Sequence, residues 1–217
     1  MVHVSNAVID PETGATLSLK QLLCGNNNKT WKESHSDEWF RLAQGKVRVK
    51  GTETCFFVKW KTKPKHITPT YLRPVCEIRP QKENTHQIRI TVSGKKFVTE
   101  GNLSTPTANL TTAKIHFNGT ISTDSAKYAC FDISNFYFET PMTRNQYAYA
   151  KEHLDNILDN IIEQCNLTMI ADRKGCVLIE IRSGMCGLPI AGKIAHELTI
   201  AHLDPYGYSP CRLTPGL

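Results

Sequence analysis

The sequence has no apolar stretch long enough to cross a bilayer. Even its longest uninterrupted apolar runs are short, for example residues 176–179 (CVLI). A spanning helix needs about 20 apolar residues, so we expect no membrane partner. The N-terminal segment MVHVSNAVIDPETG also lacks the basic start and apolar core of a secretory leader. These absences predict an intracellular protein, cytoplasmic or nuclear, and not a secreted one.

No two of the eight cysteines form a C-x-x-C pair, and their spacing matches no zinc motif. The chain is also longer than the small, cysteine-dense scaffolds that depend on disulfides. Several cysteines lie in apolar, strand-like runs such as AKYACFDI, so we predict buried free thiols. Sequons would matter only in a secreted glycoprotein, which is a minor alternative; they occur at Asn28, Asn102, Asn109, Asn118 and Asn166.

Positive charge is concentrated in one part of the sequence. Residues 46–96 contain thirteen Lys and Arg but three Asp and Glu, a local charge of +10, whereas the rest of the chain carries −4. This asymmetry is typical of a protein that holds a polyanion. A solvated basic face without a partner produces the same pattern, so charge alone leaves both interpretations open.

The first half of the chain divides into two predicted regions. Residues 1–36 are polar and show no sustained periodicity, which predicts a poorly ordered N-terminal arm. Residues 37–104 predict a basic, β-rich region: a short helix at DEWFRLAQG, strands at ETCFFVKW, VCEIRP and HQIRITV, and a hairpin turning at Ser93-Gly94. A loop is predicted between the first two strands because prolines do not fit a strand ladder; these are Pro64, Pro69 and Pro74.

Residues 105–217 mix helices and strands without a regular repeat. A helix is predicted after Ser104 or Thr105, with Pro106 at its first position and Leu110, Ala113 and Phe117 along one side. AKYACFDIS and GCVLIEIRSG predict strands, and EHLDNILDNIIEQC and PIAGKIAHELTIAHLD predict helices. The pattern predicts an α+β fold, with antiparallel β-hairpins and helices packed on a mixed sheet.

Asp132 is the residue that points to chemistry. A carboxylate within a run as apolar as YACFDI is unfavourable to bury unless it is paired or binds a cation. Considered alone, an Asp that ends a strand by capping a turn or pairing with a lysine is the more frequent explanation.

The order of four segments around Asp132 favours the cation-binding explanation over the structural one. These segments are IRPQKENTHQIRITVSG, STPTANLTTAKIHFN, CFDISNFYFETPM and IRSGMCGLPIAGKIAHEL. The series resembles the polymerase of Ty1/copia-type LTR retrotransposons, over about residues 37–217. The resemblance implies polymerase fingers at 37–104, part of a palm at 105–217, and RNA-directed DNA polymerase (reverse transcriptase) activity. It also implies as partners an RNA or DNA template–primer, deoxynucleoside triphosphates and other domains of a Pol polyprotein.

The resemblance assigns roles to single residues. Asp132 would be catalytic and bind Mg²⁺, one ion activating the primer hydroxyl and a second steadying the leaving group. The carbonyl of Ile133 would reach the second ion, and Tyr137 would be a steric gate against the ribose 2′-OH, with a core aromatic as an equal alternative. Arg89 would hold the triphosphate on its flat fork of donors, assisted by Lys82, unless it is an ordinary surface arginine.

The segment GMCGLPIAG resembles the family motif G-h-Y-G-L-x-Q-A/S, a loop that leads into a helix beneath the nucleotide. Gly187 there would allow a close backbone approach to the nucleotide. The sequence departs from the motif at Cys186, where Tyr is usual, and at Ile190, where a Gln contacts the nucleotide and an Ile has no hydrogen-bonding group. These departures predict altered nucleotide handling.

A larger departure is the missing x-x-D-D hairpin, since no Asp-Asp pair occurs in the 217 residues. One Asp does not hold two Mg²⁺ ions, so we expect an incomplete metal site and no polymerisation by this chain.

Two functional hypotheses follow: a reverse transcriptase fragment, or a non-catalytic nucleic-acid-binding relic or co-opted fragment that keeps the basic fingers. A cysteine hydrolase built on Cys186 and His196 has no identifiable third group. The polymerase hypothesis requires the strands at 127–134 and 176–182 to pack with the helix at 152–165.

Overall fold

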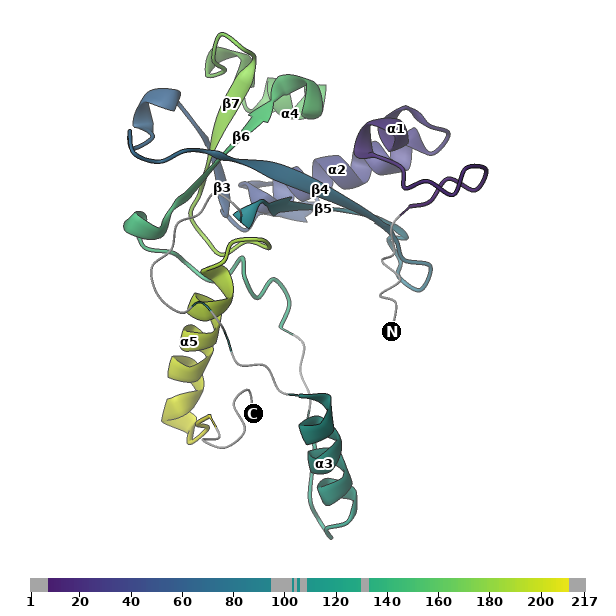
Figure 1. The fold of residues 1–217 in the computed structure, drawn as a ribbon, viewed down its shortest axis with the longest axis vertical. Coiled ribbons are helices and arrows are strands. Elements are labelled where there is room, and N and C mark those ends of the chain that lie inside the picture. The colour runs from purple at the N-terminus through teal and green to yellow at the C-terminus, as the bar shows by residue number, and fades with distance from the viewer. Residues whose placement is uncertain (1–7, 95–102, 104, 106–108, 130–132, 211–217) are drawn as a thin grey trace.

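The computed structural model describes residues 8–94, 103, 105, 109–129 and 133–210 (Figure 1). Its centre is a five-stranded mixed sheet in the order β3-β7-β6-β4-β5, in which β4 and β6 are parallel and the other neighbours antiparallel. The fold is α+β, as predicted. The strands are β3 (Cys55–Val58), β4 (Thr70–Ile78), β5 (His86–Val92), β6 (Ala148–His153) and β7 (Cys176–Ile181), with a separate hairpin of β1 (Gly45–Lys46) and β2 (Val49–Lys50).

The helices surround this sheet unevenly. The α-helices of the described residues are α1 (Leu19–Cys24), α2 (Asn28–Leu42), α3 (Leu110–Ile121), α4 (Asp159–Gln164) and α5 (Ala191–Leu203). Of these, α2 lies along one face of the β4–β5 pair, whereas α3 stands apart from the sheet (Figure 1). Within the described part of the chain, no helix combines the length and the apolar character that crossing a membrane requires.

The N-terminal region differs from the loosely ordered arm that we expected. Both α1 and most of α2 lie before residue 37, and Trp31 of α2 is only 2% exposed. Trp31 belongs to a small second core with Val8, Leu22 and Ile88. The predicted short helix at DEWFRLAQG covers only the end of α2, and periodicity missed residues 28–36 because the inner side of α2 also buries polar residues, which are His35, Ser36 and Glu38.

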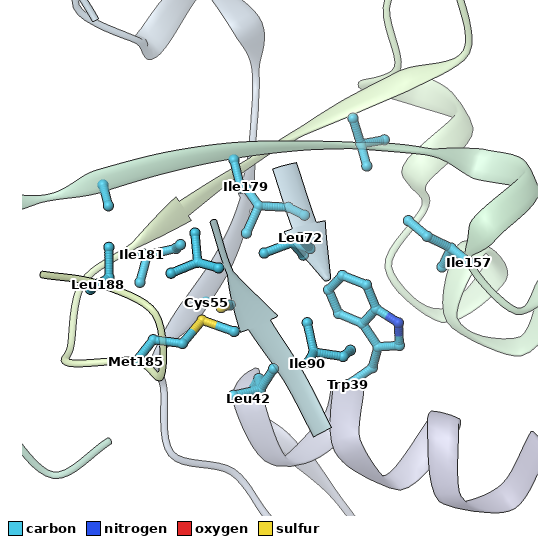
Figure 2. Packing of buried hydrophobic residues seen from close by; sticks show 14 of the residues in the cluster. Trp39, Leu42, Cys55, Leu72, Ile90, Ile157, Ile179, Ile181, Met185 and Leu188 are labelled. Carbon is cyan, nitrogen blue, oxygen red and sulfur yellow. The ribbon is translucent and has the colours of Figure 1, made fainter. Parts of the chain in front are cut away.

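The main core lies between the sheet and the C-terminal half of α2 (Figure 2). Trp39 and Leu42 of α2 meet Leu72 of β4 and Ile90 of β5 there. The loop after β7 contributes Met185 to the same cluster, where its side chain is fully buried. The loop between β7 and α5 is therefore fixed to the sheet by apolar packing.

The outer edge of β5 is closed by hydrogen bonds from outside the sheet. The N–H groups of Ile88 and Ile90 donate to Ser34 Oγ (2.8 Å) and Glu38 Oε1 (3.0 Å), which lie one turn apart on α2. The next outward N–H, that of Val92, donates to the carbonyl of Cys186 (2.9 Å). A helix and a loop thus occupy the groups that an additional strand would use.

Pro74 lies within β4, contrary to the prediction that it belongs to a loop. It pairs with Ile90, whose N–H is directed away from β4 toward Glu38. Pro74 and Ile90 therefore form a pair without mutual hydrogen bonds, so the missing N–H of proline faces away from β5. On that side β4 pairs with β6 only at Thr70 and Tyr71, which leaves an edge position where proline is tolerated.

The helix predicted at 152–165 is mostly not formed. Residues 148–153 are strand β6, a short 3-10 helix follows at Leu154–Asn156, and only α4 is helical. β6 lies between β7 and β4 and pairs with β7 along its whole length, so sheet hydrogen bonds override helical propensity there. Ile157 and Ile161, part of the predicted apolar stripe, are buried in the main core from this different backbone path.

The helix predicted after residue 105 is present as α3 but begins later. Its N-cap is Asn109, whose side chain accepts a hydrogen bond from the N–H of Thr112 (3.0 Å). The proposed cap Ser104 and Pro106 lie outside the described residues. No residue of α3 is buried, and its predicted apolar side is exposed at Leu110 (71%) and Phe117 (52%).

The strand predicted around Asp132 is not seen in the described residues. Residues 126–129 and 133–134 are exposed and belong to no strand, and residues 130–132 lie outside the described part. The second arm of the predicted Ser93-Gly94 hairpin lies outside it as well. Of the predicted packing, the structure shows β7 and α4 contributing side chains to the same core, whereas a strand at 127–134 is not seen in the described residues.

The described cysteines are free thiols, as predicted, but they are not uniformly buried. Cys55 is buried and Cys24 is exposed, while the others are intermediate. Burial raises the pKa of Cys55 to about 12, so this thiol stays protonated at neutral pH.

Candidate functional site

The loop between β7 and α5 carries the G-M-C-G-L-P segment and packs against the end of β5. Val92 donates its N–H to the carbonyl of Cys186 (2.9 Å). Gly187 has a φ of +95°, and a Cβ built on it would lie 1.9 Å from the carbonyl oxygen of Val92. Only glycine fits this position, because a side chain would collide with backbone that has no room to move. The close approach predicted for Gly187 is made to β5, and its approach to a nucleotide stays a prediction.

Gly184 joins the same loop to the turn at residues 134–139, which begins two positions after Asp132. Its N–H donates to the carbonyl of Thr140 (2.8 Å), and a Cβ built on it would lie 2.5 Å from the carbonyl oxygen of Tyr137. The structure thus brings together three of the segments singled out in the sequence: the end of the Arg89 strand, the glycine loop, and the turn that follows Asp132.

Ile133 and Tyr137 differ in their exposure. Ile133 is 53% exposed and comes immediately before the turn. Tyr137 is half-buried and packs against the main core. A half-buried ring at the surface of a core suits both a steric gate and a core aromatic, so both interpretations of Tyr137 remain.

Arg41 connects this turn to α2. Its Nη1 donates to Asn135 Oδ1 (3.0 Å), and its guanidinium lies over the ring of Phe138 at 4.4 Å from the centroid. Asn135 has a φ of +55°, which asparagine tolerates better than most residues. The guanidinium therefore contacts the turn twice, through a hydrogen bond to Asn135 and through a cation–π contact with Phe138.

Glu38 holds Arg41 in turn. Arg41 Nε and Nη2 donate to the two carboxylate oxygens of Glu38, each at 2.8 Å. Glu38 is 4% exposed and also accepts the N–H of Ile90 (3.0 Å). A buried carboxylate is stable when it is paired and hydrogen-bonded in this way. Glu38 and Arg41 thus link α2, the centre of β5 and the turn after Asp132.

Arg89 lies on the face of β5 opposite to α2, because Ile88 and Ile90 are buried and Arg89 alternates with them. On the same face of β4, Arg73 pairs with Thr91 and is diagonal to Arg89, which pairs with Val75. Tyr71, 46% exposed, continues this row. Among the described residues neither Arg73 nor Arg89 forms an ion pair. Glu77 of the same face is paired with Arg79, so this open face presents two guanidinium groups that have no carboxylate partner among the described residues, beside an aromatic ring.

Lys82 is far from the glycine loop. It is exposed in the turn between β4 and β5, at the end of β5 opposite to Val92. A strand rises about 3.3 Å per residue, so the length of β5 separates the two by roughly 20 Å. Lys82 lines a surface groove of 710 Å³ that mixes both signs of charge, from Arg41, Arg48, Arg79, Glu33, Asp37 and Glu83 among others.

Cys186 and Ile190, the two departures from the family motif, are both half-buried. Ile190 is half-buried at the start of α5 and packs against the main core. Burial raises the pKa of the half-buried Cys186 thiol above its usual value. Neither side chain adds a polar group to the loop.

Asp132 lies outside the described residues, so its position relative to the other site residues is not defined. Within the described ranges, no three His, Cys, Asp or Glu side chains come together as ligands for a metal ion.

The sequence did not indicate Glu38, Arg41 or Arg73 as site residues. The three-residue spacing of Glu38 and Arg41 is visible in DEWFRL, but such pairs are usually solvated and weak. The burial that makes this pair important depends on β5, which is distant in sequence. Arg73 stood in a segment predicted to be a loop.

Comparison of the chain with protein-family models, with curated proteins and with solved structures found no match.

Proposed function

We propose that this chain is the fingers and part of the palm of a Ty1/copia-type reverse transcriptase, and that it binds a template–primer without extending it. The observation that carries the proposal is the contact of the G-M-C-G-L-P loop with both the end of β5 and the turn after Asp132. The resemblance implies that these three segments border one nucleotide site, and segments that do so must be neighbours in space. The contacts among the end of β5, the glycine loop and the turn after Asp132 therefore support the proposal.

The open face of β4 and β5 supports the nucleic-acid part of the proposal. Arg73 and Arg89 extend from a rigid antiparallel pair, and Tyr71 beside them offers an exposed ring. Guanidinium groups bind phosphate oxygens, and aromatic rings stack on bases with little regard to sequence. Binding through this face should be tolerant of sequence and should weaken steeply with salt.

A non-catalytic nucleic-acid-binding protein is the second candidate function. It is favoured by Ile190, whose side chain is taken up by the core and has no hydrogen-bonding group. In that case template–primer binding is the function of the chain, and deoxynucleoside triphosphates and Mg²⁺ have no part in it.

Binding to a fluorescently labelled DNA primer annealed to an RNA template tests the proposal. We expect the anisotropy of the label to rise saturably, and the logarithm of the affinity to fall linearly with the logarithm of salt concentration. Arg89→Ala should reduce the magnitude of the slope of log affinity against log salt concentration by about one, because one phosphate contact is lost. Arg173→Ala removes the same charge from an exposed turn before β7 and should leave the slope unchanged.

Absence of saturable binding, or equal effects of Arg89→Ala and Arg173→Ala, would contradict the proposed interface. Primer extension separates the two candidate functions from an active enzyme. We expect no extension above an Asp132→Asn control, and extension above it would show that the metal site is complete.

A further inference from the structure

β3 is the terminal strand of the central sheet at the end opposite to β5. The N–H of Arg182 donates to the carbonyl of Thr54 (2.9 Å), so the even-numbered residues of β3 pair with β7 and the odd-numbered ones direct their N–H and C=O groups outward. Gln44 Nε2 accordingly donates to the carbonyl of Cys55 from outside the sheet (3.4 Å). Phe57 is the next outward position, and neither its N–H nor its C=O has an outward hydrogen-bond partner among the described residues.

The segments that precede and follow this edge carry an excess of positive charge. Residues 44–66 contain seven Lys and Arg but one Glu, a net charge of +6. The whole chain also carries +6, so the remainder of the chain is balanced. Six of the cations are exposed, three on the β1–β2 hairpin (Lys46, Arg48 and Lys50) and three after β3 (Lys59, Lys61 and Lys65).

Hydrogen bonds fix the loop that follows β3. Trp60 Nε1 donates to the carbonyl of Cys176 at the start of β7 (3.0 Å), and Lys63 Nζ donates to two carbonyls of its own loop. Lys63 is thus used within the loop, whereas Lys61 and Lys65 are exposed and form no ion pair among the described residues. These two ammonium groups are available to an anionic ligand.

The aromatic rings of β3 and its loop favour a polypeptide over a nucleic acid as that ligand. All three rings are half-buried: Phe57 packs on Trp39 (5.5 Å between centroids), the guanidinium of Arg182 lies 3.8 Å from the centroid of Phe56, and Trp60 is bonded to β7. Sequence-tolerant binding of single strands depends on exposed rings that stack on bases. A strand edge instead matches the backbone of an extended polypeptide, which completes the ladder of N–H and C=O groups.

We propose that the outer edge of β3 binds an extended, acidic segment of another protein by strand addition. The backbone of that segment pairs with Phe57, and its flanking carboxylates contact the cations before and after β3. A second copy of this chain fits less well, because pairing β3 with itself in either direction brings one basic flank onto another. The site lies at the end of the sheet opposite to the proposed nucleic-acid interface and does not rest on the proposed function.

A fluorescein-labelled peptide, acetyl-EEEVTVTVEEE-amide, tests the site on the full chain. We expect its anisotropy to rise saturably, and the uncharged peptide QQQVTVTVQQQ to bind about tenfold more weakly. Two further acidic peptides carry N-methyl groups, one on its valines and the other on its threonines. Alternate N–H groups of a strand point in opposite directions, so one methylated peptide should lose binding and the other should keep it.

Charge reversal after β3 tests the contribution of the lysines. Lys61→Glu combined with Lys65→Glu should weaken the acidic peptide about tenfold. Lys114→Glu combined with Lys127→Glu makes the same change at exposed positions on and after α3, and should alter the affinity by less than about twofold. Equal effects of the two double substitutions would overturn the proposed contact.

Amide hydrogen exchange locates the bound peptide. Exchange of the Phe57 N–H should slow on saturation with the acidic peptide, while that of Phe56, which already pairs with β7, should be unchanged. The proposal is overturned if binding is not saturable, if both methylated peptides bind like the parent, or if a template–primer displaces the peptide. Slowing at Phe57 with rising protein concentration alone would assign the edge to a second copy and overturn it as well. Template–primer binding is measured separately, so failure here leaves the proposed function standing.

Discussion

At the scale of single residues, two polar groups on the inner side of α2 determine much of the local structure. Glu38 is buried with an arginine and a backbone N–H as partners, whereas one ring nitrogen of the buried His35 has no hydrogen-bond partner among the described residues. The sequence shows both as ordinary members of a polar helix. Their burial follows from β5 and residues 152–159, which are distant in sequence, so local patterns could not predict it.

Glu38→Ala should lower the free energy of unfolding by about 3 kcal/mol, because it leaves the N–H of Ile90 and the guanidinium of Arg41 without their carboxylate partner. Urea unfolding followed by tryptophan fluorescence measures the change. Glu33→Ala alters an exposed carboxylate of the same helix and should stay within about 0.5 kcal/mol of the parent. Equal effects of the two substitutions would mean that the Glu38 network adds nothing to stability.

Acidification should destabilise the protein through His35. Its pKa is lowered to about 4 by burial in the folded state and returns to about 6.5 on unfolding. Between these values the unfolded chain binds more protons, so stability that is present above pH 6.5 is lost as the pH falls toward 4. The loss should be about 2–3 kcal/mol between pH 7.5 and 4.5.

The free energy of unfolding at these two pH values, measured for the parent and for His35→Phe, isolates the contribution of His35. The variant should lose less stability than the parent on acidification. The same loss in both proteins would show that His35 is protonated or exposed in the folded state.

At the scale of secondary structure, both strands and helices were predicted in part: β6 was not predicted, and the strand predicted at 127–134 is not seen in the described residues. β3, β5, β7 and α5 lie where alternation and apolar periodicity placed them. The helix predicted at 152–165 lost its first two residues to β6, which pairs with β7, and is α-helical only in α4; α2 was underestimated because it buries polar residues. At the site, the glycine loop and its helix were predictable from GMCGLPIAG, but its contact with β5 required the tertiary structure.

The glycine loop makes a prediction at this scale. Gly187→Ala should lower the free energy of unfolding by more than about 3 kcal/mol, since a Cβ would meet the Val92 carbonyl at 1.9 Å in addition to the strain of a positive φ. Gly207→Ala is a matched control, because Gly207 has a φ of +84° but open space around the added Cβ. It should lose about 1 kcal/mol. Comparable losses, measured by urea unfolding, would show that the loop moves away from β5 without penalty.

At the scale of the whole molecule, apolar side chains are exposed on α3 and around the end of α5. On α3 and the residues after it these include Phe117 (52%), Ile121 (69%) and Tyr128 (49%). Around the end of α5 they include Leu203 (40%) and Tyr206 (72%). Apolar exposure of this kind favours association in water.

The chain should therefore self-associate as its concentration rises, and Phe117→Ser combined with Ile121→Ser should reduce this. Sedimentation velocity over a range of concentrations measures the effect. His116→Ser changes an exposed polar residue of the same helix and should leave association unchanged. Because α3 has no buried residue, the double substitution should leave urea unfolding of the core unaltered. Unaltered association of the double variant would place the contact elsewhere.

The hydrogen bonds along the outer edge of β5 have a consequence for how such association can proceed. A fibril grows by adding strands one after another, and each unit must offer a strand edge on both sides. Here Ser34, Glu38 and the Cys186 carbonyl occupy three successive N–H groups of one terminal strand. Of the two terminal strands of the sheet, β3 is then the one beside which a further strand could pair. Pairing through β3 would use up that terminal edge in each molecule, so growth by this route should stop at a dimer and not continue into a fibre.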